Sequence, residues 1–361
     1  MFFFIKNKIS IIIPTLNEAK NIIRIIKKLL YVLKKRKLEI IIVDDNSSDG
    51  TARLILENFS NNSKVKLVQK KGGVNLIESV KLGIQVSDGE YCAVMDGDGQ
   101  HSSDDMTKML SLVKKNDLVI GCRNIKKIKF LSDFRVKMSL FFNKLIFYTS
   151  KIEISDPLTG FFIFKKKIIG KRFFSLKTSG FKVLLDLIYT LNNNKIKIHE
   201  FQINFEERKR GISKLNPSVI FSFITQLISL NFYSLISPQF IGFLVVGFFG
   251  MFLYFISFYF FFSILQLTYF YAYLLSSIIT VNLNFFLNIY LSILILNRVK
   301  INYFFSLLKY YLLNIPGLII GVNLAIYLNN NFNLNIYFIT FIAISFDAWF
   351  KYYFLKTWIF K

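Results

Sequence analysis

The sequence predicts an α/β domain followed by an all-α membrane domain, and three observations support this division. In the first part of the chain, short apolar runs rich in β-branched residues alternate with segments whose apolar residues recur at helical spacing. Charged residues recur up to about residue 214, whereas Asp347 is the single acidic residue after Glu207. The remainder holds four apolar stretches, each near the ~20 residues that a membrane-spanning helix needs. We therefore expect a soluble domain at 1–236 and a membrane domain at 237–361.

The soluble part contains strands and helices in alternation. Because the strands are continuous apolar runs, they indicate a parallel sheet that helices cover on both faces. In such sheets ligands bind beyond the carboxyl ends of the strands, and the polar clusters of this sequence follow those ends. We expect strands within 10–18, 39–51, 64–71, 90–96 and 117–123, and helices over about 18–35, from Thr51 onward, and over 75–87.

The membrane part predicts four spanning helices and an orientation. The loop at 297–302 carries Arg298 and Lys300, the loop at 329–335 carries no charge, and lysines crowd the C-terminal end. By the positive-inside rule, both termini and the soluble domain then lie in the cytosol, at the inner (cell) membrane. The expected spans are 240–263, 271–296, 304–328 and 335–356.

Two further segments, 135–151 and 216–235, combine apolar bulk with polar or basic positions. Helices that lie in the headgroup plane of a membrane have this pattern, so we expect both to be interfacial. For the first segment, an ordinary amphipathic helix packed on the domain core is an open alternative.

The formal net charge of +24 does not by itself indicate a nucleic-acid partner. Nucleic-acid-binding domains combine a basic surface with a recognisable motif, and the sequence contains none. We therefore expect a membrane partner and no nucleic acid. No feature of the sequence predicts an oligomeric state.

Five motifs stand out in the soluble part: "IIIPTLNE", "IIVDDNSSDGT", "MDGDGQH", "DPLTGFFIFKK" and "FEERKRGISKL". Taken in this order and spacing, they resemble glycosyltransferase family 2, and within it the polyprenol-phosphate (dolichol-phosphate) mannose synthases. The resemblance implies a GT-A fold, the Rossmann-like fold of nucleotide-diphospho-sugar transferases. Through "FLVVGFFG" and "VNLNFFLN", the membrane part is similar to the GtrA-like four-helix family.

The "DGDGQ" segment is the candidate metal site. A nucleotide sugar loses a diphosphate, whose charge calls for a divalent cation, and hard Mg²⁺ or Mn²⁺ prefers oxygen ligands. The resemblance makes Asp98 and Gln100 the metal ligands and places Asp96 and Gly97 nearer the donor ribose and sugar. The family usually shows D-A-D-L-Q, whereas glycines stand at positions 97 and 99 here.

Two other strand ends carry the expected nucleotide contacts. A carboxylate at such a position can accept a hydrogen bond from a base or a ribose. For Asp44, capping of the turn "NSSDG" is the alternative. The contacts that the resemblance implies are Pro14, Leu16 and Glu18 in the first segment and Val43, Asp44 and Asp45 in the second.

The acceptor side needs cations more than it needs a base. A lipid phosphate is already anionic at pH 7, and the arginine fork suits such a group. Asp156 is expected either to orient the donor sugar or to cap a turn. The resemblance implies that Arg123, Arg135 and Ser139 hold the acceptor phosphate, that Arg208 and Lys214 hold the donor diphosphate, and that the catalytic set is Asp96, Asp98, Arg123 and Arg135.

These features predict an inverting, metal-dependent transfer of a hexose to a polyprenyl phosphate at the cytosolic membrane face. The resemblance favours mannose from GDP-mannose, which would give a lipid-linked sugar donor for glycan assembly. Glucose transfer from UDP-glucose is one alternative. A glycolipid flippase with a regulatory glycosyltransferase-like domain is another.

Overall fold

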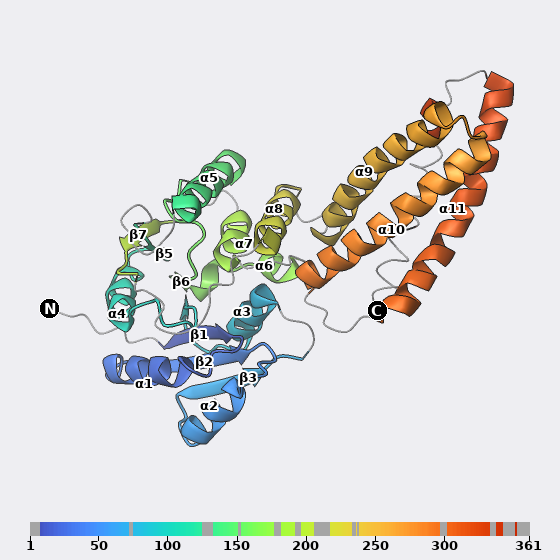
Figure 1. Ribbon diagram of the computed structural model, residues 1–361. Coiled ribbons are helices and arrows are strands. Elements are labelled where there is room, and N and C mark those ends of the chain that lie inside the picture. The colour runs from blue at the N-terminus through green and yellow to red at the C-terminus, as the bar shows by residue number, and fades with distance from the viewer. Residues whose placement is uncertain are drawn as a thin grey trace. The chain divides into compact units, whose positions relative to one another are not determined.

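The chain separates into two compact units, residues 1–235 and 236–361 (Figure 1). The first contains an α/β fold, and the second contains long helices. The structure is a computed structural model, which describes residues 8–71, 75–124, 133–150, 153–176, 182–191, 196–205, 217–232, 236, 238–296, 302–332, 337–341 and 351.

The first unit is built on a seven-stranded sheet with the order β3-β2-β1-β4-β6-β5-β7. The α/β class predicted from the sequence is confirmed, but a purely parallel sheet is wrong, because β6 runs antiparallel to both of its neighbours. All other pairings are parallel. The strands are β1 (Ile9–Thr15), β2 (Leu38–Asp44), β3 (Val65–Gln69), β4 (Tyr91–Val94), β5 (Leu118–Cys122), β6 (Phe162–Lys165) and β7 (Ile198–Gln202).

The reversed direction of β6 has a consequence for the site. Its first residue, Phe162, pairs with Val94 at the end of β4 and with Ile120 near the end of β5. The turn that precedes β6, residues 156–160, therefore lies at the carboxyl ends of the parallel strands. Two motifs that are about 60 residues apart in sequence thus meet at one edge of the sheet.

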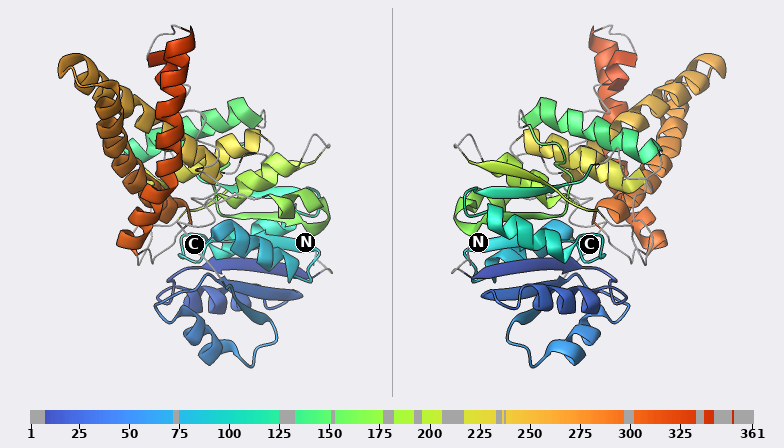
Figure 2. Two further views of the ribbon diagram at one scale, coloured as in Figure 1. Left: turned by 90° about the vertical axis from the view of Figure 1, so that its right-hand side faces the viewer. Right: turned by 90° about the vertical axis from the view of Figure 1, so that its left-hand side faces the viewer.

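Helices cover both faces of the sheet, and β1 shows why (Figure 1, Figure 2). Ile11 and Ile13 pack into the core of one face and Ile12 into the core of the other, as the two-residue period of a strand requires. Full burial of each such side chain stabilises the fold by roughly 1.5–3 kcal/mol. One face carries α1 (Ile22–Val32), α2 (Thr51–Phe59) and α4 (Ser103–Leu112), and the other carries α3 (Leu76–Gln85), α6 (Lys171–Ser175) and α7 (Val183–Thr190).

The two segments predicted to be interfacial form α5 (Asp133–Ser150) and α8 (Pro217–Asn231). They pack against each other, with the rings of Phe142 and Phe223 4.6 Å apart between centroids. Their other faces stay open to solvent, where Tyr148 on α5 is 75% and Ile224 on α8 is 37% exposed. Each helix therefore has one packed face and one exposed apolar face.

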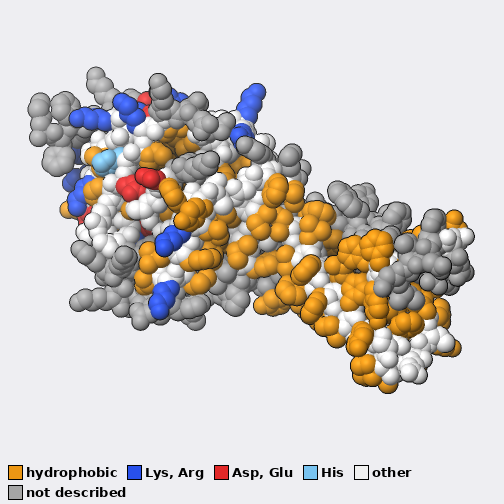
Figure 3. All heavy atoms as spheres, turned by 90° about the horizontal axis from the view of Figure 1, so that it is seen from above, with side chains coloured by type: hydrophobic (Ala, Val, Ile, Leu, Met, Phe, Trp, Pro, Cys, Tyr) orange, Lys and Arg blue, Asp and Glu red, His pale blue; other side chains and the backbone are white. Residues whose placement is uncertain are grey.

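The second unit contains three helices that are long and apolar enough to cross a membrane, within the residues that the structure describes. Hydrophobic side chains cover much of its visible surface in Figure 3. The fourth predicted span, 335–356, lies outside the described residues except for 337–341 and 351, and it stays a prediction. The elements are α9 (Pro238–Tyr259), the π-helix η3 (Phe260–Ile264), α10 (Tyr269–Leu296) and α11 (Tyr303–Phe332).

Candidate active site

The loops after β1 and β2 brace each other at the carboxyl edge of the sheet. Asn17 has a left-handed backbone (φ 58°), and its side-chain oxygen accepts from the Ser48 amide at 2.9 Å. The Asn17 amide in turn donates to Ser47 Oγ at 2.9 Å. The Ala19 amide donates to Asp49 Oδ2 at 3.0 Å. These reciprocal bonds hold the two predicted nucleotide-contacting segments in one fixed arrangement.

Asp44 takes the capping position that the sequence left open. It is 2% exposed, and its carboxylate accepts from Thr15 Oγ1 (3.0 Å), the Ser47 amide (3.0 Å) and Ser47 Oγ (2.6 Å). These bonds tie the end of β2 to the end of β1. A direct contact of Asp44 with nucleotide stays a prediction.

Asp45 is also turned into the protein. It is 3% exposed, lies 2.6 Å from Lys70 Nζ, and accepts from the Asn75 amide at 2.7 Å. Asn75 in turn caps the start of α3 by accepting from the amides of Ile77 and Glu78. Asp45 thus fixes the entry into α3.

The remaining predicted nucleotide contacts flank these two acids. Pro14 and Val43 are buried and lie opposite each other in the register of β1 and β2. Leu16 and Glu18 are half-buried on the loop after β1, where Glu18 accepts from Asn21 Nδ2 at 3.0 Å. All four therefore belong to the same edge.

The "DGDGQ" turn follows β4, and glycine is favoured at its positions 97 and 99 for two different physical reasons. Gly97 is buried, and a Cβ at this position would lie 3.3 Å from Thr15 Cγ2, so glycine lets the turn pack closely on β1. Gly99 has φ +78°, a left-handed conformation that other residues rarely adopt. Both glycines shape the turn between Asp98 and Gln100.

Asp98 and Gln100 can hold a hard cation. Both are half-buried, and Asp98 Oδ1 accepts from the Gln100 amide at 3.1 Å, which places the two side chains on one tight turn. Within the described residues there is no group of three or more His, Cys, Asp or Glu side chains that could hold a metal. Two oxygen ligands fit an ion such as Mg²⁺, which keeps several waters and also binds substrate phosphate.

Asp96 lies beside Gly160, on the turn before β6. A Cβ on residue 160 would overlap the Asp96 carboxylate, so the glycine leaves the space that this side chain occupies. Asp96 Oδ2 lies 3.5 Å from Nε2 of His101, a buried ring between Phe161 and Phe205. The Asp96 side chain remains 39% exposed.

The charge of Asp96 depends on these neighbours. Burial would raise the pKa of Asp96, but the contact with His101 and the charges of Lys182 and Arg123 hold that pKa below its ordinary value. The group is therefore ionised at neutral pH.

Arg123 and Asp156 form a bidentate ion pair. Asp156 is fully buried, and its Oδ2 accepts from the Arg123 amide (3.1 Å) and from Nε (2.7 Å), while Oδ1 accepts from Nη2 (2.8 Å). Burial lowers the pKa of Arg123, but the contact with Asp156 outweighs this effect and raises that pKa above its ordinary value. The guanidinium also lies 5.3 Å from the ring centroid of Phe205. Asp156 therefore anchors Arg123.

Lys182 belongs to the same group of charges, and sequence reasoning missed it. Its Nζ donates to the carbonyl oxygen of Leu158 at 2.8 Å, and its side chain lines a pocket together with Asp96. Burial, with the nearby charge of Arg123, holds the pKa of Lys182 below its ordinary value. The available signal was a lone cation at the start of the apolar run "VLLDLIY".

Three of the predicted residues lie partly or wholly outside the described residues. The side chain of Arg135 on α5 is outside the described residues, as are Arg208 and Lys214. Ser139 is half-buried on α5. The acceptor roles of Arg135 and Ser139 and the donor roles of the other two stay predictions.

Comparison with known proteins gives concordant matches. The model of the family "Glycosyl transferase family 2" matches residues 10–173. A dolichol-phosphate mannosyltransferase of Pyrococcus furiosus is 29% identical over 255 residues, which are 68% of this chain and 69% of the relative. The dolichol-phosphate mannosyltransferase of Saccharomyces cerevisiae is 26% identical over 60% of this chain and 85% of its own length.

Two further matches are a relative with a different sugar in its name and a solved structure of lower sequence identity. A dolichyl-phosphate beta-glucosyltransferase of Dictyostelium discoideum is 27% identical over 58% of this chain and 69% of its own length. Among solved structures, a mannosyltransferase from Pyrobaculum calidifontis in complex with GDP-Man and Mn²⁺ has a TM-score of 0.46 and 16% identity, and the match covers 63% of each chain.

Proposed function

We propose that this chain is a family 2 glycosyltransferase of the dolichol-phosphate mannose synthase type, which transfers mannose from GDP-mannose to a polyprenyl phosphate. The transfer is metal-dependent, inverts the anomeric carbon, and takes place at the cytosolic face of the membrane. The mannosyltransferase relatives support the choice of hexose.

One observation carries the proposal: the turn at Asp98 and Gln100 and the turn at residues 156–160 meet at one sheet edge, beside Arg123. A divalent metal, Mg²⁺ or Mn²⁺, held by Asp98 and Gln100 would neutralise charge on the departing diphosphate. An oxygen of the lipid phosphate attacks the anomeric carbon as the bond to the diphosphate breaks. Because this nucleophile is already an anion, no general base is required.

The acceptor phosphate has a cation at this edge. The Nε and Nη2 atoms of Arg123 donate to Asp156, and Nη1, which makes no hydrogen bond to a described residue, can donate to an oxygen of the phosphate. Asp156 also fixes the plane of the guanidinium. Arg135 and Ser139 of α5 complete the acceptor site, and Arg208 and Lys214 hold the donor diphosphate.

The exposed apolar faces of α5 and α8 support a lipid acceptor. Phe141 and Tyr148 on α5 are 58% and 75% exposed, and Phe232 just after α8 is 53% exposed. The first membrane-spanning segment begins at Phe240, about eight residues later. Helices with an exposed apolar face of this kind bind in the headgroup region of a membrane, where the phosphate of a polyprenyl lipid is located.

The test is transfer into lipid. Membranes that contain the full chain are incubated with polyprenyl phosphate and labelled GDP-mannose or UDP-glucose, with Mg²⁺, with Mn²⁺, or with a chelator. We expect lipid-extractable label from GDP-mannose, lost with the chelator. Label from UDP-glucose alone would favour the glucosyltransferase, which the Dictyostelium relative makes the second candidate. No lipid label from either donor would contradict the proposal.

A further inference from the structure

A pocket opens at the carboxyl edge of the sheet, between the end of β4, the turn before β6 and the helices α3 and α7. Its walls are of two kinds. The apolar wall comes from strands and helices, and the polar wall comes from one acid, one base and the turn between them. Val80 and Phe162 belong to the first kind, and Asp96, Lys182, Thr159 and Gly160 belong to the second.

The acid and the base of this pocket are not bonded to each other. No ion pair of 4.0 Å or less joins Asp96 to Lys182 in the part of the chain that the structure describes. Lys182 gives one ammonium hydrogen to the Leu158 carbonyl, which leaves two of its three donors. The neighbouring acid Asp156 is, by contrast, taken up completely by Arg123. Asp96 contacts His101 at 3.5 Å but does not pair with Lys182, so both the acid and the base can also bind a ligand.

The chemistry of the pair selects the ligand. A phosphate here would meet the Asp96 carboxylate, and a hydrocarbon would give neither charge a polar partner within the pocket. Adjacent hydroxyl groups satisfy both, because one donates to the carboxylate and the other accepts from the ammonium. We propose that Lys182 is a donor-sugar-binding residue, which together with Asp96 holds neighbouring hydroxyls of the transferred hexose.

This inference rests on the proposed function and adds a determinant of sugar specificity to it. Hexoses differ in which hydroxyls are axial, so a fixed acid and a fixed base discriminate between them by geometry. A hydrogen bond to a charged group is worth about 10- to 100-fold in affinity. The loss should therefore appear in the binding of nucleotide sugar and not in the binding of the nucleotide alone.

The experiment compares Lys182→Met with the parent in the full chain. We measure the dissociation constants of GDP and GDP-mannose by calorimetry, and kcat/KM for donor and for polyprenyl phosphate. UDP and UDP-glucose are used in the same way if these are the parent's substrates. We expect a 10- to 100-fold loss in affinity for the nucleotide sugar, with GDP affinity and acceptor KM changed by less than about two-fold.

Lys81→Met is the matched control. Lys81 is also a buried lysine that donates to a backbone carbonyl, that of Leu176 at 2.7 Å, but it lies on α3 and does not line the pocket. It should leave the affinities for GDP and for GDP-mannose unchanged. If Lys182→Met does not fold, Lys182→Gln, which keeps a donor for Leu158, is measured in its place.

Three results separate the possibilities. An unchanged preference for GDP-mannose over GDP would overturn the proposal. Equal weakening of both ligands would also overturn it, because Lys182 would then act on the phosphates. A parent that binds no nucleotide sugar would instead contradict the proposed function itself.

Discussion

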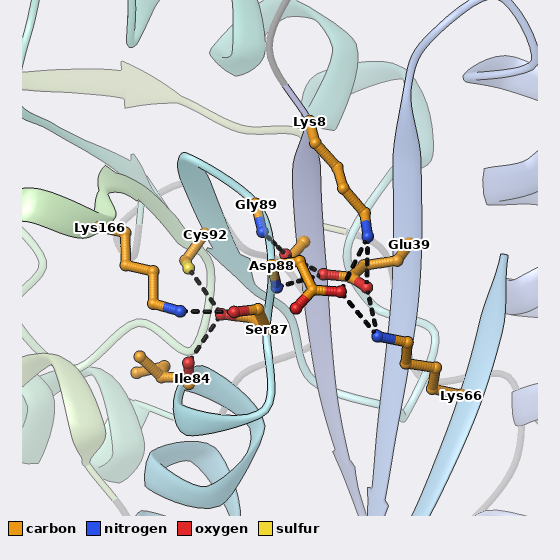
Figure 4. Close-up of polar contacts among 10 residues, drawn as sticks. Lys8, Glu39, Lys66, Ile84, Ser87, Asp88, Gly89, Cys92 and Lys166 are labelled. Carbon is orange, nitrogen blue, oxygen red and sulfur yellow. Dashed lines mark hydrogen bonds and ion pairs between the residues drawn. The ribbon is translucent and has the colours of Figure 1, made fainter.

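Both ends of the same sheet carry acids and lysines, but the two ends use these charges in different ways. At the amino ends of the strands, Glu39 is 1% exposed and lies 2.9 Å from both Lys8 and Lys66 (Figure 4). Its other oxygen accepts from Ser10 Oγ at 2.6 Å and from the Asp88 amide at 2.7 Å. Both carboxylate oxygens of Glu39 are therefore bound by groups of the protein itself.

At the carboxyl ends of the strands, an acid and a base lie close together without forming an ion pair with each other. Asp96 is 3.5 Å from His101 and shares a pocket with Lys182, to which it is not bonded. The same edge also contains closed pairs, Arg123 with Asp156 and Lys70 with Asp45. The difference separates supporting residues from binding residues. Acids and bases that pair with each other hold the site, and an acid and a base that share a pocket without pairing with each other can bind substrate.

The largest effect is expected from Asp98, which lies at the carboxyl ends of the strands. Asp98→Ala removes a metal ligand from a half-buried turn, so transfer should fall about 1,000-fold or more while the thermal midpoint stays near that of the parent. Asp88→Ala, at the amino ends of the strands, is the control and should transfer at the parental rate. Near-normal transfer by Asp98→Ala at saturating metal would contradict the metal assignment.

Gly160 tests whether the position of Asp96 matters. In Gly160→Ala the new methyl group overlaps the Asp96 carboxylate and displaces it. Because misplacing a group at a reaction centre by about 1 Å can cost about 100-fold in rate, we expect kcat to fall 10- to 100-fold. Gly170→Ala, where a Cβ would meet nothing within 4 Å, provides the matched control. Equal rates for the two variants would show that Asp96 has no fixed role.

The sequence predicted what is local and missed what is long-range. The turn at Asp98 and Gln100 follows its strand directly, and so it is visible as a motif. Lys182 finds its partner Leu158 24 residues away, and Asp156 finds Arg123 33 residues away. Both contacts depend on the antiparallel strand β6, which a pattern of alternating strands and helices does not indicate.

A smaller effect, on stability alone, is expected from Glu39 at the amino ends of the strands. Glu39→Ala leaves Ser10 Oγ and the Asp88 amide without their acceptor, which should cost about 1–3 kcal/mol in the free energy of unfolding. The urea midpoint of the full chain in detergent, followed by circular dichroism, measures this loss. Transfer per folded molecule should be unchanged, and a large fall in kcat would break the comparison between the two ends.

The smallest effect is the pH dependence of Asp88. Hydrogen bonds from Lys66 and Lys8 lower the pKa of this exposed carboxyl to about 2. Since an acid with a lowered folded pKa binds fewer protons in the folded state, its contribution is present above the ordinary value of ~3.9 and is lost as pH falls toward 2.

The comparison of the parent with Asp88→Asn tests this sign. The parent should have the higher urea midpoint at pH 6, and the difference should disappear as pH falls from about 4 to 2. Because Asp88 is exposed, 1 M salt should also reduce the difference at pH 6, whereas the buried bonds of Glu39 should persist in salt. A difference that stays constant across this pH range would show that the charge of Asp88 adds nothing to the closed network.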